Sequence, residues 1–221
     1  MRIQHSSGVL AGWFVIAVAV LMASPAAAGE VTLTDAGGRT VQVADTSRIL
    51  AIGGDITEIV YALGADARLV GVDGTSQFPP SALKDKQNVG YMRALSAEGV
   101  ISVGATLIVA SERAGPPEVV KTLKTTSTPY VEVPDQYSPQ GIAAKVRLVA
   151  RAIGAEAEGE KLVSQVEADF KDLAVGTQRI KRPVKAMFVL ACRTGASMLL
   201  VRERRRARSS SWPEAKTSRM R

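Results

Sequence analysis

RILAIGGDITEIVYALG, residues 48–64, joins a short apolar strand to an amphipathic helix through a pair of glycines. Apolar residues recur after the glycines at the i, i+3, i+4, i+7 spacing of a helix: Ile56, Ile59, Val60 and Leu63. We expect Asp55 to cap this helix, with Glu58 reaching back as in a capping box. Gly64 is expected to end the helix.

The same alternation of strand and helix continues along the chain. Further apolar strands are predicted at residues 68–72, 106–110 and 130–133, and helices at 96–103 and 116–123. Fully apolar strands that alternate with helices are typical of a mostly parallel sheet covered on both faces. The predicted fold class is therefore α/β.

Two helical stretches follow, at residues 142–153 and from 156 to about 180. At 1.5 Å per residue the second helix would be roughly 30 Å long or more, which is enough to bridge two lobes. A new strand is predicted at 184–190, as the start of a second lobe.

The charge and the rare residues exclude several classes of function. The formal net charge is +7, but residues 29–201 hold equal numbers of acidic and basic residues, so the excess lies at the C-terminal end. A neutral body argues against a nucleic-acid partner. The single histidine is His5 and the single cysteine is Cys192. Without residues 1–28 the chain has no imidazole, which removes Ser-His-Asp and Cys-His catalysis and histidine ligation of zinc or haem. We therefore expect that the protein is not an enzyme.

The N-terminus has the features of a secretory signal peptide. Arg2 precedes an apolar stretch from Val9 to Met22, and small residues follow as far as Ala28. We expect residues 1–28 to be removed by cleavage after Ala28 and the remainder to be a soluble periplasmic protein. The alternative is a membrane anchor, for which the apolar stretch is short of the roughly 20 residues that span a bilayer.

The C-terminal residues 201–221 change abruptly in character, with eight basic residues and no apolar period after Val201. A basic arm for nucleic acid or anionic lipid and a solvated disordered tail are two interpretations. We favour a third, a frameshift near residue 200, because back-translation in another frame gives an apolar helix end followed by Gly-Gly. On this interpretation the second lobe, residues 181–200, is truncated, and the chain binds its ligand weakly or not at all.

Three segments resemble the haemin-binding proteins of bacterial ABC importers. These segments are NVGYMRALSAEGV at 88–100, IGGDITEI at 52–59 and ASERAGPPE at 110–118. The resemblance spans roughly residues 30–200. It implies two α/β lobes joined by one long helix, with a first lobe at 29–140, a helical segment at 141–180 and the start of the second lobe at 181–200.

The resemblance also implies a function and a site. The protein would be a monomeric periplasmic binder of haemin that delivers it to an inner-membrane ABC permease and its ATPase. Tyr91 would be the axial ligand of the haem iron, and Arg93 would favour the phenolate or meet a haem propionate. A free phenol has a pKa of about 10, so the iron must displace its proton. Glu98 would dock on basic residues of the permease.

Alternatives to this function remain open. One alternative is a protein of the same fold that carries a siderophore or cobalamin instead of haemin, and another is a non-functional truncated product. Among the other aromatic residues, Tyr61 and Tyr130 are expected to pack in the core, and Tyr137 is a candidate for the edge of a cleft. Met92 is expected to fill a gap in the core.

Overall fold

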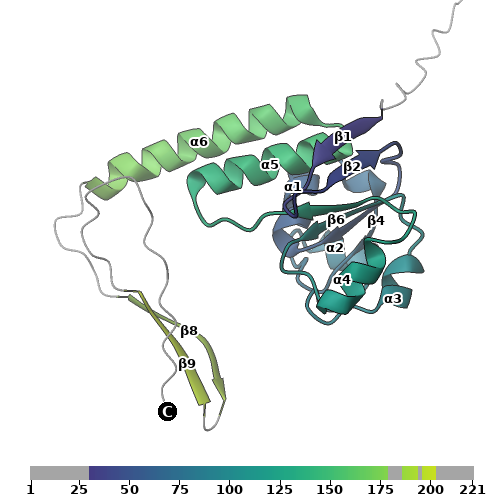
Figure 1. Cartoon of the computed structure of the whole chain (residues 1–221). Helices are drawn as coiled ribbons and strands as arrows, with labels where there is room; N and C mark the ends of the chain where they lie inside the picture. The colour runs from purple at the N-terminus through teal and green to yellow at the C-terminus, as the bar shows by residue number, and fades with distance from the viewer. Residues whose placement is uncertain (1–29, 179–185, 194–195, 203–221) are drawn as a thin grey trace, which may run out of the picture.

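A five-stranded parallel sheet forms the centre of the protein (Figure 1), whose computed structural model describes residues 30–178, 186–193 and 196–202. The strand order is β5 (Gln87–Asn88), β4 (Leu69–Val72), β3 (Ile49–Ile52), β6 (Leu107–Ser111) and β7 (Tyr130–Val133). All neighbouring pairs are parallel. Four of the five strands predicted from the sequence lie in this sheet, each within one residue of its predicted bounds, so the α/β prediction is confirmed.

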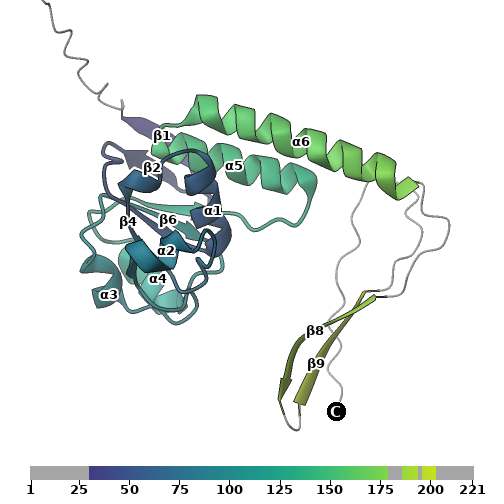
Figure 2. The same ribbon diagram turned by 180° about the vertical axis from the view of Figure 1, so that it is seen from behind.

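Helices cover both faces of the sheet, as the apolar strands require. Every residue of β3 and β6 is buried. One face packs against α1 (Gly54–Ala62), α5 (Pro139–Ile153) and the start of α6 (Glu156–Gln178). The other face packs against α3 (Ala97–Ile101) and α4 (Pro117–Leu123). Figure 2 shows α5 and α6 together on one side of the sheet and α3 and α4 on the other.

The sheet domain also has a 3-10 helix at Asp66–Arg68 and three further short elements, none of which is predicted from the sequence. Strands β1 (Val31–Thr34) and β2 (Thr40–Val43) form an antiparallel hairpin whose inward side chains join the core. Asp35 fixes the hairpin turn, because its carboxylate accepts hydrogen bonds from the backbone and the side chain of Arg39. The third element is α2 (Ser81–Asp85), which precedes β5. Strands β1 and β2 alternate polar and apolar residues over only four positions, so they lack the continuous apolar run that predicts the equally short β3.

The predicted capping box on α1 is wrong. The helix begins at Gly54, and its N-cap is Gly53, at a φ of 127° that favours glycine. A side chain on Gly54 would collide with the backbone oxygen of Thr75. Asp55 therefore lies within the first turn, where it pairs with Lys145 of α5 instead of capping the helix.

The α3 helix begins as its sequence predicts. Ser96 is the N-cap, and its hydroxyl accepts a hydrogen bond from the backbone N–H of Gly99 at 3.0 Å. The helix is shorter than predicted, because it ends at Ile101 rather than at residue 103.

The long helix α6 begins against the sheet domain and extends beyond it (Figure 1). Ser138 caps α5, and Gly154 separates the two helices. Gly159 lies so close to Ala150 of α5 that a side chain there would collide with it. Beyond Val163 no residue of α6 is fully buried. The 23 residues of α6 match the length predicted for a helix between lobes.

The last described elements are strands β8 (Ala186–Arg193) and β9 (Ala196–Arg202), which form an antiparallel hairpin. The sequence predicts only one strand here, and β9 continues two residues into the predicted tail. The predicted signal peptide, its cleavage after Ala28 and the tail from residue 203 onward lie outside the described residues. Within the described part of the chain, no helix combines the length and the apolar character needed to cross a membrane.

Asp73, directly after β4, joins the ends of β3 and β4. Its fully buried carboxylate accepts hydrogen bonds from the backbone N–H groups of Gly53 and Thr75, both at 2.8 Å. The Ser76 hydroxyl also donates to it at 3.2 Å, and the same hydroxyl lies 2.7 Å from that of Thr57 on α1.

Replacing Asp73 with Ala is expected to lower the free energy of unfolding by at least about 2 kcal/mol, because buried donors lose their acceptor. Urea unfolding followed by far-ultraviolet circular dichroism measures this change. Asp85→Ala, at an exposed carboxylate, is the control and should stay within about 0.5 kcal/mol. Equal stabilities of the two variants would contradict the role of Asp73.

Candidate ligand-binding site

The loops that leave the carboxyl ends of the strands form one edge of the sheet. Strand β3 has β4 on one side and β6 on the other, so the chain connections diverge between β3 and β6. In open α/β sheets ligands bind outside the carboxyl ends of the strands at such a switch point. The residues that follow β5, β6 and β7 at this edge include Tyr91, Arg113 and Tyr137.

The backbone around Tyr91 is fixed by hydrogen bonds to two neighbouring loops. Gly90, at a φ of 95°, accepts a 2.7 Å hydrogen bond from the Gly74 N–H in the loop after β4. On the other side, Gly115, in the loop after β6, donates to the Met92 carbonyl at 2.8 Å. The Gly115 carbonyl in turn accepts from the Leu95 N–H at 2.9 Å. The Tyr91 loop therefore has a defined conformation that the sheet imposes.

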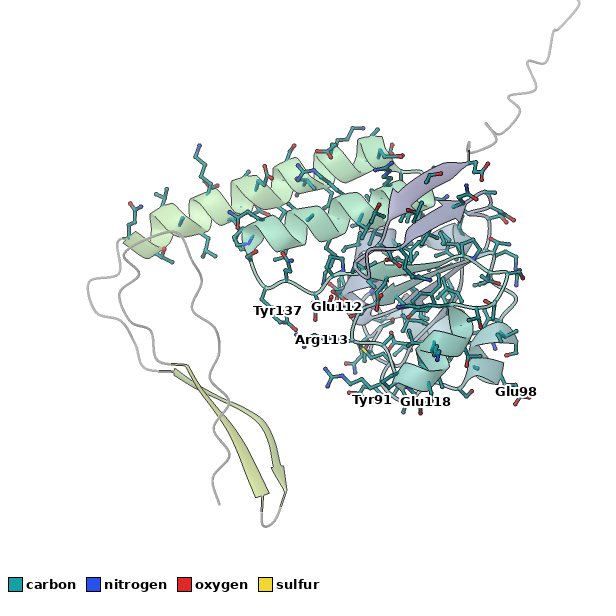
Figure 3. The ribbon with its side chains drawn as sticks, in the orientation of Figure 1. Tyr91, Glu98, Glu112, Arg113, Glu118 and Tyr137 are labelled. Carbon is teal, nitrogen blue, oxygen red and sulfur yellow. The ribbon has the colours of Figure 1, made fainter. Side chains whose placement is uncertain are left out.

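The side chains of this loop divide between core and solvent. Leu95 is buried, and Met92 packs partly buried against the core, as the sequence predicts. Tyr91 is 53% exposed although it is a large aromatic residue, and Arg93 is also exposed. Figure 3 shows Tyr91 on the same side of the domain as Arg113 and Tyr137. A fixed backbone that presents an exposed phenol is suited to contact a ligand.

A second cluster lies at the same edge, after β6 and β7. Asp135 is its centre, with one carboxylate oxygen 2.9 Å from the Lys145 ammonium. Its other oxygen accepts a 2.8 Å hydrogen bond from the Tyr137 hydroxyl and lies 2.6 Å from Nε of Arg113. Lys145, whose side chain is only 9% exposed, also pairs with Asp55. The cluster thus connects α1, α5 and two strand ends.

The cluster shifts the ionisation of its members. Partial burial alone would raise the pKa of Asp135, but hydrogen bonds from Lys145 and Tyr137 and the neighbouring positive charges lower the pKa below its ordinary value. Partial burial, together with the hydrogen bond to Asp135, raises the pKa of Tyr137. Burial opposes the charge of Lys145, but its two carboxylate partners raise its pKa overall. Lys145 and Asp135 are therefore both charged at neutral pH.

Glu98 lies apart from these residues. It is exposed in the first turn of α3, and Figure 3 shows it at the opposite end of the domain from Tyr137 and well separated from Tyr91. The structure thus places Tyr91 and Arg93 in one loop and Glu98 on a separate surface.

The two tyrosines expected in the core are there. Tyr61 is partly buried against the main cluster, and Tyr130 is 2% exposed. Burial raises the pKa of Tyr130 well above its ordinary value, so the phenol is neutral. Neither tyrosine belongs to the candidate site.

Sequence reasoning missed Arg113, Asp135 and Lys145. Arg113 and Asp135 both lie within two residues of a strand end. The sequence predicts β6 and β7, so a search for charged residues directly after each predicted strand would identify Arg113 and Asp135. Lys145 is on the apolar side of α5, where the helical period predicts no charge. In the described part of the chain, no three His, Cys, Asp or Glu side chains are placed to hold a metal ion.

Comparison with known proteins gives one family and two kinds of relative. The family described as "Periplasmic binding protein" matches residues 49–200. The periplasmic heme-binding protein RhuT from Roseiflexus sp. RS-1 is 36% identical with a TM-score of 0.67, over 71% of this chain and 59% of that one. The heme-binding protein HmuT is 31% identical with a TM-score of 0.69, over 80% of this chain and 58% of that one.

Two curated sequences are also similar. An uncharacterised ABC transporter substrate-binding lipoprotein from Bacillus subtilis is 29% identical over 72% of this chain and 51% of its own length. A vitamin B12-binding protein from Pectobacterium atrosepticum is 24% identical over 64% of this chain and 50% of its own length. The chain thus spans about half the length of these curated relatives. All of these relatives are named as binding proteins, but their names give different ligands. Two are named for heme, one for vitamin B12, and the name of the Bacillus protein gives no ligand.

Asp135→Asn is expected to destabilise the protein at neutral pH, with a difference that shrinks in acid. The pKa of Asp135 lies below its ordinary value of 3.8. The stability that its charge contributes is therefore fully present above about pH 4 and is lost as the pH falls through the lower folded-state pKa.

Urea unfolding of both proteins, followed by circular dichroism at about pH 7 and about pH 3, measures this dependence. Glu58→Gln, at an exposed carboxylate on α1, is the control and should give no such difference. A difference between Asp135→Asn and the unchanged protein that persists undiminished in acid would contradict the prediction.

Proposed function

The chain belongs to the periplasmic binding protein family, and from this premise we propose that it binds haemin in the periplasm for an ABC importer. Residues 29–140 form the first lobe, residues 141–180 include the helix between lobes, and the second lobe starts within 181–200. The family match and the similarity to several heme-binding structures support this function.

Tyr91 is the proposed axial ligand of the haem iron, and its position is the observation that carries the proposal. An exposed phenol on a loop fixed from both sides lies at the edge of the sheet where this class of fold binds ligands. Phenolate oxygen is a hard anionic donor for ferric iron, and tyrosine is a known haem ligand. The residues after position 28 include no histidine that would compete for the iron.

Arg93 is the proposed electrostatic partner of this ligand. It is exposed two residues from Tyr91 in the same loop, and its guanidinium is positively charged at every relevant pH. A fixed positive charge favours the phenolate over the phenol. It also attracts the propionates of haemin.

Cobalamin is the second candidate ligand, because one similar curated protein is a vitamin B12-binding protein. The identity to that protein is 24%, against 36% and 31% for two of the heme-binding structures. A siderophore is a third candidate within the same family. Competition of haemin with cyanocobalamin and with a ferric siderophore separates the three.

Glu98 is proposed to dock on the permease. It is exposed on α3, on a surface separate from the ligand-binding edge, so a permease can contact it while ligand is bound. Charges on such surfaces mainly set the encounter rate and the orientation of the partners.

Titration of the purified protein with haemin tests the ligand. We expect a complex with a tyrosinate-to-iron charge-transfer band. The binding should be weak, because the described sheet domain contacts a ligand at one edge of the sheet. Tyr91→Phe should abolish the band, whereas Tyr137→Phe, at the other exposed tyrosine of this edge, should retain it. Absence of haemin binding, or an unchanged spectrum in Tyr91→Phe, would overturn the proposal.

Transport into vesicles that contain the cognate permease and ATPase tests Glu98. Glu98→Gln should leave haemin affinity unchanged and lower the transport rate severalfold, with a weaker dependence on salt. Glu58→Gln, an exposed carboxylate on the opposite face of the sheet, is the matched control. Normal transport by Glu98→Gln would remove this residue from the docking surface.

A further inference from the structure

We propose that Arg113, held between Asp135 and Tyr137, binds a carboxylate of the ligand. This inference rests on the proposed function and adds a second anchoring point beyond the Tyr91 loop. The chemical class that it selects is an anionic ligand with a carboxylate at its periphery, as in haemin, over a ligand whose peripheral acids are amides or esters.

The position of Arg113 is the first support. It lies two residues after β6, in the same loop as Gly115, whose backbone is hydrogen-bonded to the Met92 carbonyl of the Tyr91 loop at 2.8 Å. The two loops are therefore joined to each other through their backbones. Figure 3 shows Tyr91, Arg113 and Tyr137 along the same side of the domain. A ligand that meets Tyr91 thus lies at the edge to which Arg113 belongs.

The second support is that Arg113 retains unused donors. Its Nε pairs with Asp135 at 2.6 Å, and its guanidinium carbon lies 4.9 Å from the centre of the Tyr137 ring. Its side chain is still 42% exposed. Within the described residues, the guanidinium donates no hydrogen bond through its two terminal amino groups. These groups form the planar fork that matches a carboxylate.

The partners of Arg113 are themselves fixed, so the guanidinium is oriented before a ligand arrives. Asp135 is held by the Lys145 ammonium at 2.9 Å and by the Tyr137 hydroxyl at 2.8 Å. Its backbone N–H donates to the carboxylate of Glu112 at 2.9 Å. Because an arginine held in this way loses little side-chain freedom on binding, more of its interaction with a carboxylate is retained as affinity.

The charges of the cluster define how a ligand carboxylate would reach Arg113. Lys145 is shared between Asp55 and Asp135, so Arg113 also helps to neutralise Asp135. Glu112 is a further acidic group beside the cluster and is exposed to solvent. A ligand carboxylate would therefore bind the terminal amino groups of Arg113 while Asp135 keeps its contact with Nε.

Binding of haemin and of its dimethyl ester, in which both propionates are neutral, tests this inference. Arg113→Gln should weaken haemin binding about 10-fold or more, the usual effect of a hydrogen bond to a charged group. It should leave the affinity for the dimethyl ester unchanged, and Arg113→Lys should recover part of the loss. Arg147→Gln, at an exposed arginine paired with Glu160 on the helices, is the matched control and should bind both ligands normally.

The possible results separate this inference from the proposed function. If haemin binds with the Tyr91-dependent band but Arg113→Gln binds it normally, only the role of Arg113 is overturned. An equal loss for haemin and for the ester would show that Arg113 acts on the structure of the edge and would also overturn it. If the unchanged protein binds no haemin, both proposals fail.

Discussion

The buried carboxylate of Asp73 is the interaction on which the candidate site depends. Parallel strands end with backbone N–H groups that no further strand can satisfy, and a carboxylate is a strong acceptor for several of them at once. Asp73 accepts from the loop after β3 and from its own loop after β4. The second of these loops carries Gly74, which donates to Gly90 beside Tyr91. Hydrogen bonds thus connect the loop that carries the exposed Tyr91 phenol to the side chain of Asp73, which has no exposure to solvent.

Much of the sheet could be predicted because its signal is local. Strands β3, β4, β6 and β7 are apolar runs that end at turns, and the helices between them have a clear period. The predicted cap at Asp55 fails because the close approach of Gly54 to Thr75, which is 21 residues away, starts the helix earlier. The β1–β2 hairpin is missed because its short strands alternate polar and apolar residues, whereas β3, which is equally short, is apolar throughout.

Only part of the candidate site can be predicted from the sequence. Tyr91 and Arg93 are adjacent in one segment, so a resemblance to known proteins identifies both. The cluster around Asp135 is assembled from residues as far apart as Asp55 and Lys145, which only the order of strands in the sheet brings together. Lys145 lies on the apolar side of α5, where the helical period predicts an apolar residue. Its ion pairs with Asp55 and Asp135 explain a charge at this position.

The close contact between Gly159 and Ala150 fixes the first turns of α6 against α5. The first turns of α6 are fastened to α5, and α5 is fastened to the sheet, so a tilt of α6 must pivot near this point. The helix continues for 19 residues beyond Gly159, or about 28 Å at 1.5 Å per residue. A rotation of about 5° at the pivot therefore moves the far end by about 2.5 Å.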